Sequence, residues 1–293
     1  MSDAQNICLI GFGEVGQVLA EDLAARSVTL SAWDSLCCDA DSAPSRAAIW
    51  VRKGENAEDA ACDADIIISA VTAAQTLNAA ESIATAIKKD AVYLDLNSAS
   101  PGAKQKAAAL INANGGRYVE AAVMSPIGPK RIACPMLLGG PYAEAFLALA
   151  KDLGFKGAKF FSAEYGKASA AKMCRSVVVK GVEALLTESL LSARHYGVEE
   201  TVVSSLSDLF PGPDWEKLSV YMISRALEHG KRRAEEMREV AKTVEEAGLS
   251  PLMSSACAER QDRSAAYRYA LAEESLPQML DAILNGARAG RAL

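Results

Sequence analysis

The 293-residue sequence contains no run of about 18 apolar residues, the length needed to cross a bilayer as a helix. Its first residues lead directly into a strand-like apolar run and leave no room for a signal peptide, so we expect a cytoplasmic protein. It has two histidines, and its seven cysteines form no C-x-x-C pair, which argues against a zinc site. We therefore expect no bound metal, and reduced thiols.

The chain also has no excess of positive charge. Its formal net charge is −6, with a pI near 5.2, which argues against nucleic acid or an anionic membrane surface as a partner. The basic run Lys231-Arg232-Arg233 is followed at once by glutamates, as is typical of a solvated helix face. Half of the residues are hydrophobic, enough for a packed core. These features leave a small molecule as the expected partner.

A glycine motif near the start carries the most information. Gly11-Phe12-Gly13-Glu14-Val15-Gly16 lies between the apolar run Ile7–Ile10 and a helical pattern from Gln17 to Ala25. This is the strand, turn and helix context of the dinucleotide fingerprint, in which the helix N-terminus receives a pyrophosphate. The motif predicts a nicotinamide dinucleotide as cofactor.

Asp34 bears on which dinucleotide binds. It follows the second strand-like run, Val28–Trp33, where an acidic side chain would accept from a ribose 2′-hydroxyl. A carboxylate there repels a 2′-phosphate, and the next four residues offer no arginine to neutralise one. We expect NAD, with NADP still possible because Arg46 and Arg52 could fold back towards this point.

The pattern of apolar runs divides the chain in two. Residues 1–163 alternate short strand-like runs with helical patterns, including an amphipathic helix over 74–87, and predict a Rossmann-type, mostly parallel sheet with helices on both faces. Residues 164–293 predict an all-α domain with one long helix from Gly166 to about Tyr196 and one or two helices between Asp214 and Ala247. We expect this helical domain to bind substrate and to form a homodimer.

Lys172 is the predicted acid/base residue. Transfer of hydride at a carbonyl carbon requires a proton donor or acceptor at the oxygen. Lys172 lies on the first turns of the long helix among small or apolar residues, where lost solvation would suit a lysine to proton transfer. On the same face, Arg175 could hold a carboxylate, with Ser176 beside it. A lysine that merely reaches solvent is the alternative, and Lys180 is more typical of a structural residue.

Four segments in order resemble the β-hydroxyacid dehydrogenases, the family that includes 3-hydroxyisobutyrate and 6-phosphogluconate dehydrogenases. They are the glycine motif, Asp95–Pro101, Glu120–Pro126 and Gly166–Lys172. The resemblance implies that Lys172 is the catalytic lysine. It further implies that Met124 and Ser125 bind substrate, and that Asn97 and Ser98, together with Val71, lie at the cofactor.

The chain departs from the family pattern in three places. Met124-Ser125-Pro126 replaces a serine-glycine-glycine sequence, Arg175-Ser176 replaces paired asparagines, and Glu235-Glu236 stands near the position of a lysine-aspartate pair. The sequence around His229 resembles that of a less characterised branch of this family. His229 could bind an anionic substrate, although a solvated helix face is the simpler interpretation.

These observations predict an NAD(P)-dependent oxidoreductase that interconverts a hydroxy acid, or a related alcohol, and its carbonyl form. An imine reductase on the same architecture is one alternative, although such enzymes usually replace the lysine. A non-catalytic dinucleotide-binding redox sensor is another. True 6-phosphogluconate dehydrogenase activity is disfavoured by the short chain.

Overall fold

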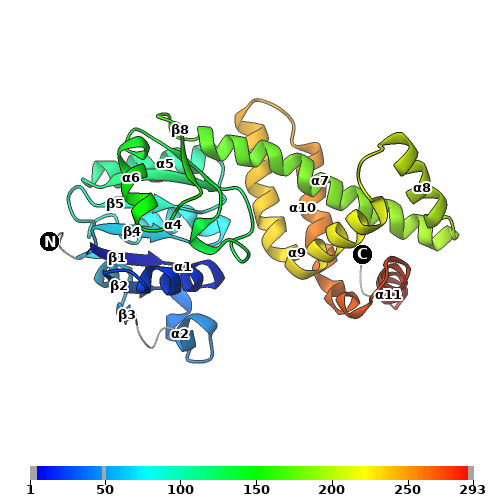
Figure 1. Ribbon diagram of the computed structural model, residues 1–293, viewed down its shortest axis with the longest axis horizontal. Coiled ribbons are helices and arrows are strands. Elements are labelled where there is room, and N and C mark those ends of the chain that lie inside the picture. Colours follow the sequence, from blue (N-terminus) through cyan, green and yellow to red (C-terminus); the bar gives the residue numbers. More distant parts are fainter. Residues whose placement is uncertain (1–4, 48–50, 290–293) are drawn as a thin grey trace. The chain divides into compact units, whose positions relative to one another are not determined.

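The structure is a computed structural model that describes residues 5–47 and 51–289. The chain forms two compact units, residues 1–173 and 174–293 (Figure 1). The sequence placed the boundary at 163/164, whereas the units divide later, within the long helix α7 (Lys167–Tyr196). The first seven residues of α7 therefore belong to the first unit.

The first unit is built on one eight-stranded sheet with the strand order β3-β2-β1-β4-β5-β6-β7-β8. All neighbouring strands are parallel except β6 and β7, which are antiparallel. The part from β3 to β6 has the strand order of dinucleotide-binding folds, in which the chain reverses direction across the sheet between β1 and β4. The predicted α/β class is confirmed. The strands are β1 (Gln5–Ile10), β2 (Val28–Trp33), β3 (Arg52–Lys53), β4 (Ile66–Ser69), β5 (Val92–Asp95), β6 (Arg117–Val123), β7 (Met136–Gly139) and β8 (Ala158–Ser162).

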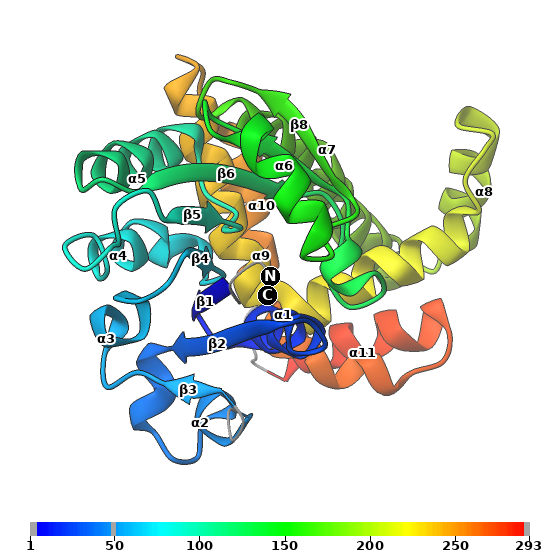
Figure 2. The same ribbon diagram turned by 60° about the vertical axis from the view of Figure 1, so that its left-hand side comes forward.

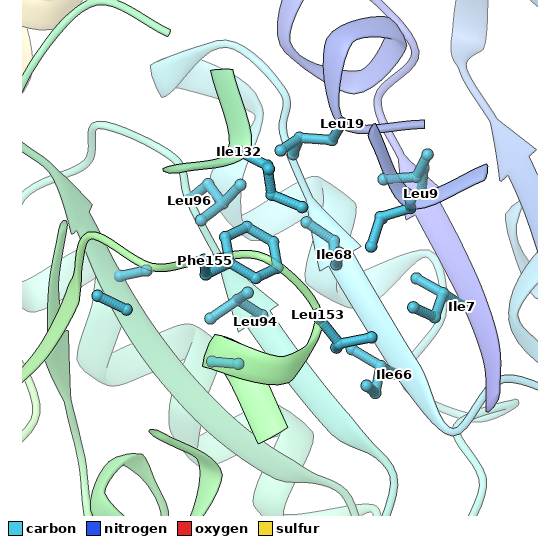
Figure 3. Close-up of a cluster of buried hydrophobic side chains, with 14 of the residues drawn as sticks. Ile7, Leu9, Leu19, Ile66, Ile68, Leu94, Leu96, Ile132, Leu153 and Phe155 are labelled. Atoms are coloured by element: carbon cyan, nitrogen blue, oxygen red, sulfur yellow. The ribbon is translucent and has the colours of Figure 1, made fainter. Parts of the chain in front are cut away.

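The central strands are apolar on both faces and form two separate cores. In β1, Ile7 and Leu9 point into one core while Cys8 and Ile10 point into the other, because successive side chains of a strand alternate. Figure 3 shows the first core, where Phe155 packs among side chains of β4 and β5. The central part of the sheet is therefore buried on both sides, as is typical of a parallel sheet.

Helices cover both faces of this sheet. Figure 2 shows α4 and α5 on one side and α6 on the other. The helix expected over 74–87 is shorter than predicted: its α-helical part ends at Glu81, and i→i+3 bonds such as Ala86 N–H to Ile83 O follow. The helical segments are α1 (Glu14–Ala24), η1 (Ser35–Cys38), α2 (Ala43–Ala47), α3 (Ala57–Ala61), η2 (Ala73–Gln75), α4 (Thr76–Glu81), α5 (Pro101–Ala113), η3 (Arg131–Ala133) and α6 (Ala143–Asp152).

The second unit is helical throughout its described residues, as predicted. After α7 come α8 (Glu199–Leu209), α9 (Trp215–Glu246), α10 (Leu252–Ser264), η4 (Ala265–Ala272) and α11 (Leu276–Arg288). Helix α9 is one helix with a kink at His229, whose φ of −120° and ψ of 15° are not helical. At the kink, Gly230 lies against α10, since a Cβ there would come within 2.4 Å of the Gln261 carbonyl oxygen. Across the described residues of both units, we find no helix with the length and hydrophobicity needed to cross a membrane.

Candidate functional site

The glycine loop after β1 lies at the edge of the sheet where the parallel strands end. Gly11 has a φ of +94°, which favours glycine, and its N–H donates to the carbonyl of Trp33 at the end of β2 (2.9 Å). A Cβ on Gly16 would come within 2.2 Å of the Gly11 carbonyl oxygen. Gly16 therefore permits the first turn of α1 to pack against the loop, as the fingerprint requires.

Gly13 has a different environment. It precedes α1 as its N-cap in an extended conformation, and a Cβ there would have no atom within 4 Å. Nothing in the fold itself demands glycine at this position, and the unfilled space lies beside the N–H groups of a helix N-terminus. This is the arrangement that admits a pyrophosphate, so the residues present fit a dinucleotide.

The two glycines should therefore respond differently to alanine. Gly16→Ala is expected to lower the free energy of unfolding by about 1–3 kcal/mol through a clash with backbone. Gly13→Ala should leave stability unchanged and weaken dinucleotide binding by roughly 5- to 150-fold, the same clash now falling on the ligand. Urea unfolding and cofactor titration of both variants measure this. Equal affinity in Gly13→Ala and wild type would contradict the assignment.

Asp34 stands at the end of β2 and joins two loops. One carboxylate oxygen accepts from the N–H of Phe12 in the glycine loop (2.7 Å), and the other accepts from the N–H of Leu36 (2.9 Å). Each oxygen keeps a second lone pair for a further donor, such as a ribose hydroxyl. The link to Phe12 fixes the acid beside the glycine loop, and no local pattern of residues indicated this contact.

The loop that follows β5 is fastened to the end of β4. The side-chain oxygen of Asn97 accepts from the N–H of Val71 (2.7 Å), and its amide nitrogen donates to Ser69 Oγ (2.9 Å). Asn97 is almost fully buried. The structure thus brings together Val71 and Asn97, two of the residues predicted for the cofactor, at the same edge as the glycine loop.

A buried charge pair that no sequence pattern predicted ties into this loop. Lys104 Nζ lies 2.8 Å from Asp95 Oδ1, with both side chains almost fully buried, and Tyr118 Oη donates to Asp95 Oδ2 (2.6 Å). Burial and the Asp95 charge raise the pKa of Tyr118 well above its usual range, so its hydroxyl keeps the proton that it donates. Asp95 Oδ1 also accepts from Asn97 N–H (2.9 Å), which ties the pair to the loop above it.

Lys172 meets the same loop. Its Nζ donates to Ser98 Oγ at 2.5 Å, and the side chain is half-buried. One turn earlier on α7, the Ser169 hydroxyl donates to the carbonyl of Ala99, the residue after Ser98. The predicted acid/base residue and a predicted cofactor residue are therefore in direct contact, an arrangement that suits proton transfer at the edge where the strands end.

Met124 and Ser125 follow β6 in the first unit and are partly exposed. The N–H of Met124 donates to the Pro135 carbonyl (2.8 Å), which continues the antiparallel pairing of β6 with β7. The chain therefore leaves the sheet only after Met124. Their predicted role in substrate binding remains a prediction.

The other predicted substrate residues lie in the second unit. Arg175 is exposed and Ser176 is buried on α7, while His229 is half-buried at the kink of α9. Burial, with the charges of Arg225 and Arg232, lowers the pKa of His229. Their roles also remain predictions. Lys180 is buried and ion-paired with Glu236, in agreement with a structural lysine.

The fold and this edge of the sheet define a Rossmann-type, dinucleotide-binding protein. A family model described as the NAD binding domain of 6-phosphogluconate dehydrogenase matches residues 6–148. A second model, described as a domain of unknown function (DUF1932), matches residues 193–264 in the helical unit.

Comparison with known proteins covers almost the whole chain. A conserved hypothetical protein from Sinorhizobium meliloti 1021 shares 35% identity, with a TM-score of 0.73 over 96% of this chain and 97% of its own. A conserved protein of unknown function, whose structure was described as similar to 3-hydroxyacid dehydrogenases, shares 30% identity, with a TM-score of 0.68 over 96% of this chain and 99% of its own. The mitochondrial 3-hydroxyisobutyrate dehydrogenase of Drosophila melanogaster is 24% identical over 72% of this chain and 65% of its own length.

The chain belongs to the family of 3-hydroxyacid dehydrogenase-like proteins, in a divergent branch marked by its C-terminal domain. The family resemblance inferred from the sequence is thus confirmed, and with it a nicotinamide dinucleotide as cofactor. An imine reductase of Streptomyces aurantiacus shares the fold at 18% identity, with a TM-score of 0.57 over 96% of this chain and 99% of its own.

Proposed function

We propose that this protein is an NAD-dependent dehydrogenase that interconverts a hydroxy acid, or a related alcohol, and its carbonyl form. The contact between Lys172 Nζ and Ser98 Oγ is the observation that carries the proposal. It puts an ionisable side chain at the loop after β5, on the edge of the sheet to which the glycine loop and Asp34 also belong. In folds of this type, that edge is where ligands bind.

In the oxidative direction, Lys172 takes the proton of the substrate hydroxyl, and in the reductive direction it returns that proton. The nicotinamide, when bound, supplies the acceptor or donor of hydride. The backbone N–H groups at the start of α1 would hold the pyrophosphate and Asp34 would hold the adenosine ribose, while Asn97 and Ser98 would position the ring. Ser98 also accepts from Lys172, which orients the ammonium. Met124 and Ser125, with Arg175, Ser176 and His229, are proposed to hold the substrate.

An imine reductase is the second candidate, because such an enzyme shares the fold. The presence of Lys172 favours a C–O substrate, since imine reductases usually replace this residue. A redox sensor is the third candidate, and it predicts tight cofactor binding without turnover. The contact of Lys172 with the loop after β5 favours an enzyme over a sensor.

The test is an assay of NAD⁺ and NADP⁺ reduction over a panel of hydroxy acids and alcohols, followed by the absorbance of the reduced nicotinamide. The reverse reaction is run with the matching ketones, aldehydes and cyclic imines. Turnover of a hydroxy acid or alcohol supports the proposal. Turnover of imines alone would assign the protein to the second candidate, and tight cofactor binding without any turnover would assign it to the third.

Asp34 should make NAD the preferred cofactor. Arg52, which could have neutralised a 2′-phosphate, is instead paired with Asp59 (3.0 Å). Replacing Asp34 with serine is expected to lower the NAD-to-NADP ratio of kcat/KM by about tenfold, because one repulsion between like charges is removed. Steady-state kinetics with both cofactors measure this ratio. A ratio that does not change would show that Asp34 does not face the 2′-position.

We also propose a homodimer formed through the helical unit. Val178, Leu185 and Tyr196 on α7 are 66%, 58% and 76% exposed, and their spacing places them along one face of the helix. Such a stripe of large apolar side chains is typical of a surface that a partner covers. Light scattering should give twice the chain mass, and Leu185→Lys should give the monomer mass. A monomeric wild-type protein would contradict the proposal.

A cytoplasmic location also remains a prediction.

A further inference from the structure

Glu120 is a fully buried carboxylate in β6 that contacts the helix carrying Lys172. One of its oxygens accepts from the N–H of Gly166 (2.6 Å), and the other accepts from the N–H of Ser169. Both N–H groups belong to the N-terminal end of α7, where helix N–H groups lack partners within the helix. Strand β6 thus supplies the hydrogen-bond acceptor for N–H groups at the start of α7, although Glu120 and Gly166 are 46 residues apart in the sequence.

This end of α7 is held at a second point as well. The Ser169 hydroxyl donates to the Ala99 carbonyl, next to Ser98, and Ser98 accepts from Lys172. Lys172 follows Ser169 by three residues, so the two side chains are neighbours on the helix surface. The position of Glu120 therefore fixes the turn from which Lys172 reaches the loop after β5.

The space around the carboxylate is tight. A Cβ on Gly139 of β7 would lie 2.9 Å from Glu120 Oε2 and 3.5 Å from the Cβ of Ala168 on α7. Glycine at position 139 thus lets the carboxylate approach the helix. An alanine at position 139 would therefore displace the Glu120 carboxylate without changing its charge.

The charged and titratable groups that face Glu120 come from four segments. Lys104 of α5 attracts its charge, and Asp95 of β5 repels it. The hydroxyls of Tyr118 in β6 and Tyr165 before α7 feel the Glu120 charge, and burial together with that charge raises the pKa of each. Burial raises the pKa of Glu120 itself, while Lys104 and the two N–H bonds oppose this rise. A negative charge at a helix N-terminus is electrostatically favourable.

We propose that Glu120 is a positioning residue for Lys172: its carboxylate holds the first turn of α7 through the N–H groups of Gly166 and Ser169, one turn before Lys172. The inference rests on the proposed function, in which Lys172 is the acid/base residue. The sequence resemblance placed Glu120 at the start of a substrate-binding segment. Its burial and its two backbone partners instead direct its carboxylate to the helix.

The test compares three variants in the assay defined above, measured in the oxidative direction as a function of pH. Glu120→Gln removes the charge and one of the two acceptors. We expect kcat to fall about tenfold through looser positioning. We also expect the acid limb of the kcat/KM profile to move down by about one pH unit, since loss of a negative charge favours neutral Lys172. A cap that only stabilised the helix would not move this limb.

Gly139→Ala separates position from charge. It should lower kcat to a similar extent and leave the acid limb in place, because the carboxylate is displaced but not neutralised. Glu164→Gln is the matched control, since Glu164 is exposed, lies near the start of α7 and undergoes the same change of charge. It should match wild type in both quantities.

Circular dichroism and NAD titration establish that each variant is folded. A folded Glu120→Gln with wild-type kcat and an unmoved acid limb would overturn the proposal. If Glu120→Gln does not fold, wild-type kcat in folded Gly139→Ala would overturn it. Failure of the proposed function is seen separately: in that case wild type itself would turn over no hydroxy acid or alcohol, or Lys172→Ala would keep full activity.

Discussion

Replacing Lys172 with alanine is expected to lower kcat/KM by about 100- to 10,000-fold, the usual contribution of a positioned acid/base group. The variant removes the only proposed proton acceptor and its 2.5 Å hydrogen bond to Ser98 Oγ. The affinity for NAD should stay within a few-fold of wild type, because Gly13 and Asp34 are untouched. Steady-state kinetics and cofactor titration measure both quantities.

Two further lysine variants sharpen this experiment. Lys172→Arg keeps the positive charge but cannot release a proton near neutral pH, so it should be about as inactive as alanine. Lys167→Ala removes an exposed lysine from the first turn of the same helix and should be fully active. Activity retained in Lys172→Arg would show that the charge is what matters and would rule out proton transfer by this residue.

The second large effect concerns stability. Glu183 on α7 is 1% exposed, and both of its carboxylate oxygens accept from Arg233 Nη1 of α9. Gln261 Nε2 of α10 donates to the same carboxylate (2.9 Å). Burial raises the pKa of Glu183, and the Arg233 charge opposes that rise. We expect Glu183→Ala to lower the free energy of unfolding by about 3–5 kcal/mol, because it leaves the arginine, whose side chain is 13% exposed, without its carboxylate partner.

The double variant Glu183→Leu/Arg233→Met should recover much of this loss, since neither charge is then left alone. Arg238→Met is the control on the same helix: its pair with Asp262 is about half exposed and should contribute less than 1 kcal/mol. Urea unfolding of these proteins, and of the single variants Glu183→Leu and Arg233→Met, gives the values. A double variant as unstable as the sum of its single changes would show that the two side chains act independently.

The sequence predicted those parts of the site that depend on local pattern. The glycine loop and Asp34 each follow an apolar run, and Lys172 lies one turn into a long helical pattern, so their places could be read from neighbouring residues. These residues stand at the expected ends of β1, β2 and the start of α7. Their roles in catalysis and binding remain predictions.

The parts that the sequence did not reveal depend on contacts between distant segments. Nothing near Lys104 or Glu120 indicates that one will pair with Asp95 in the core and the other will hold the start of α7. The apolar pattern of a short strand does not depend on the direction of the strand. The antiparallel pairing of β6 with β7 could therefore not be predicted from the sequence. Strand β3 consists of Arg52 and Lys53, which lack any apolar pattern.

Transfer of hydrogen from substrate carbon to the cofactor is the central claim, and isotope transfer tests it most directly. A hydroxy acid or alcohol found active in the panel would be prepared with deuterium on the carbinol carbon and oxidised in the presence of NAD⁺. Mass spectrometry of the reduced cofactor should show a gain of one deuterium, bound at C4 of the nicotinamide, in wild type, and almost none in Lys172→Ala over the same time. Reduced cofactor that carries no deuterium would contradict the account.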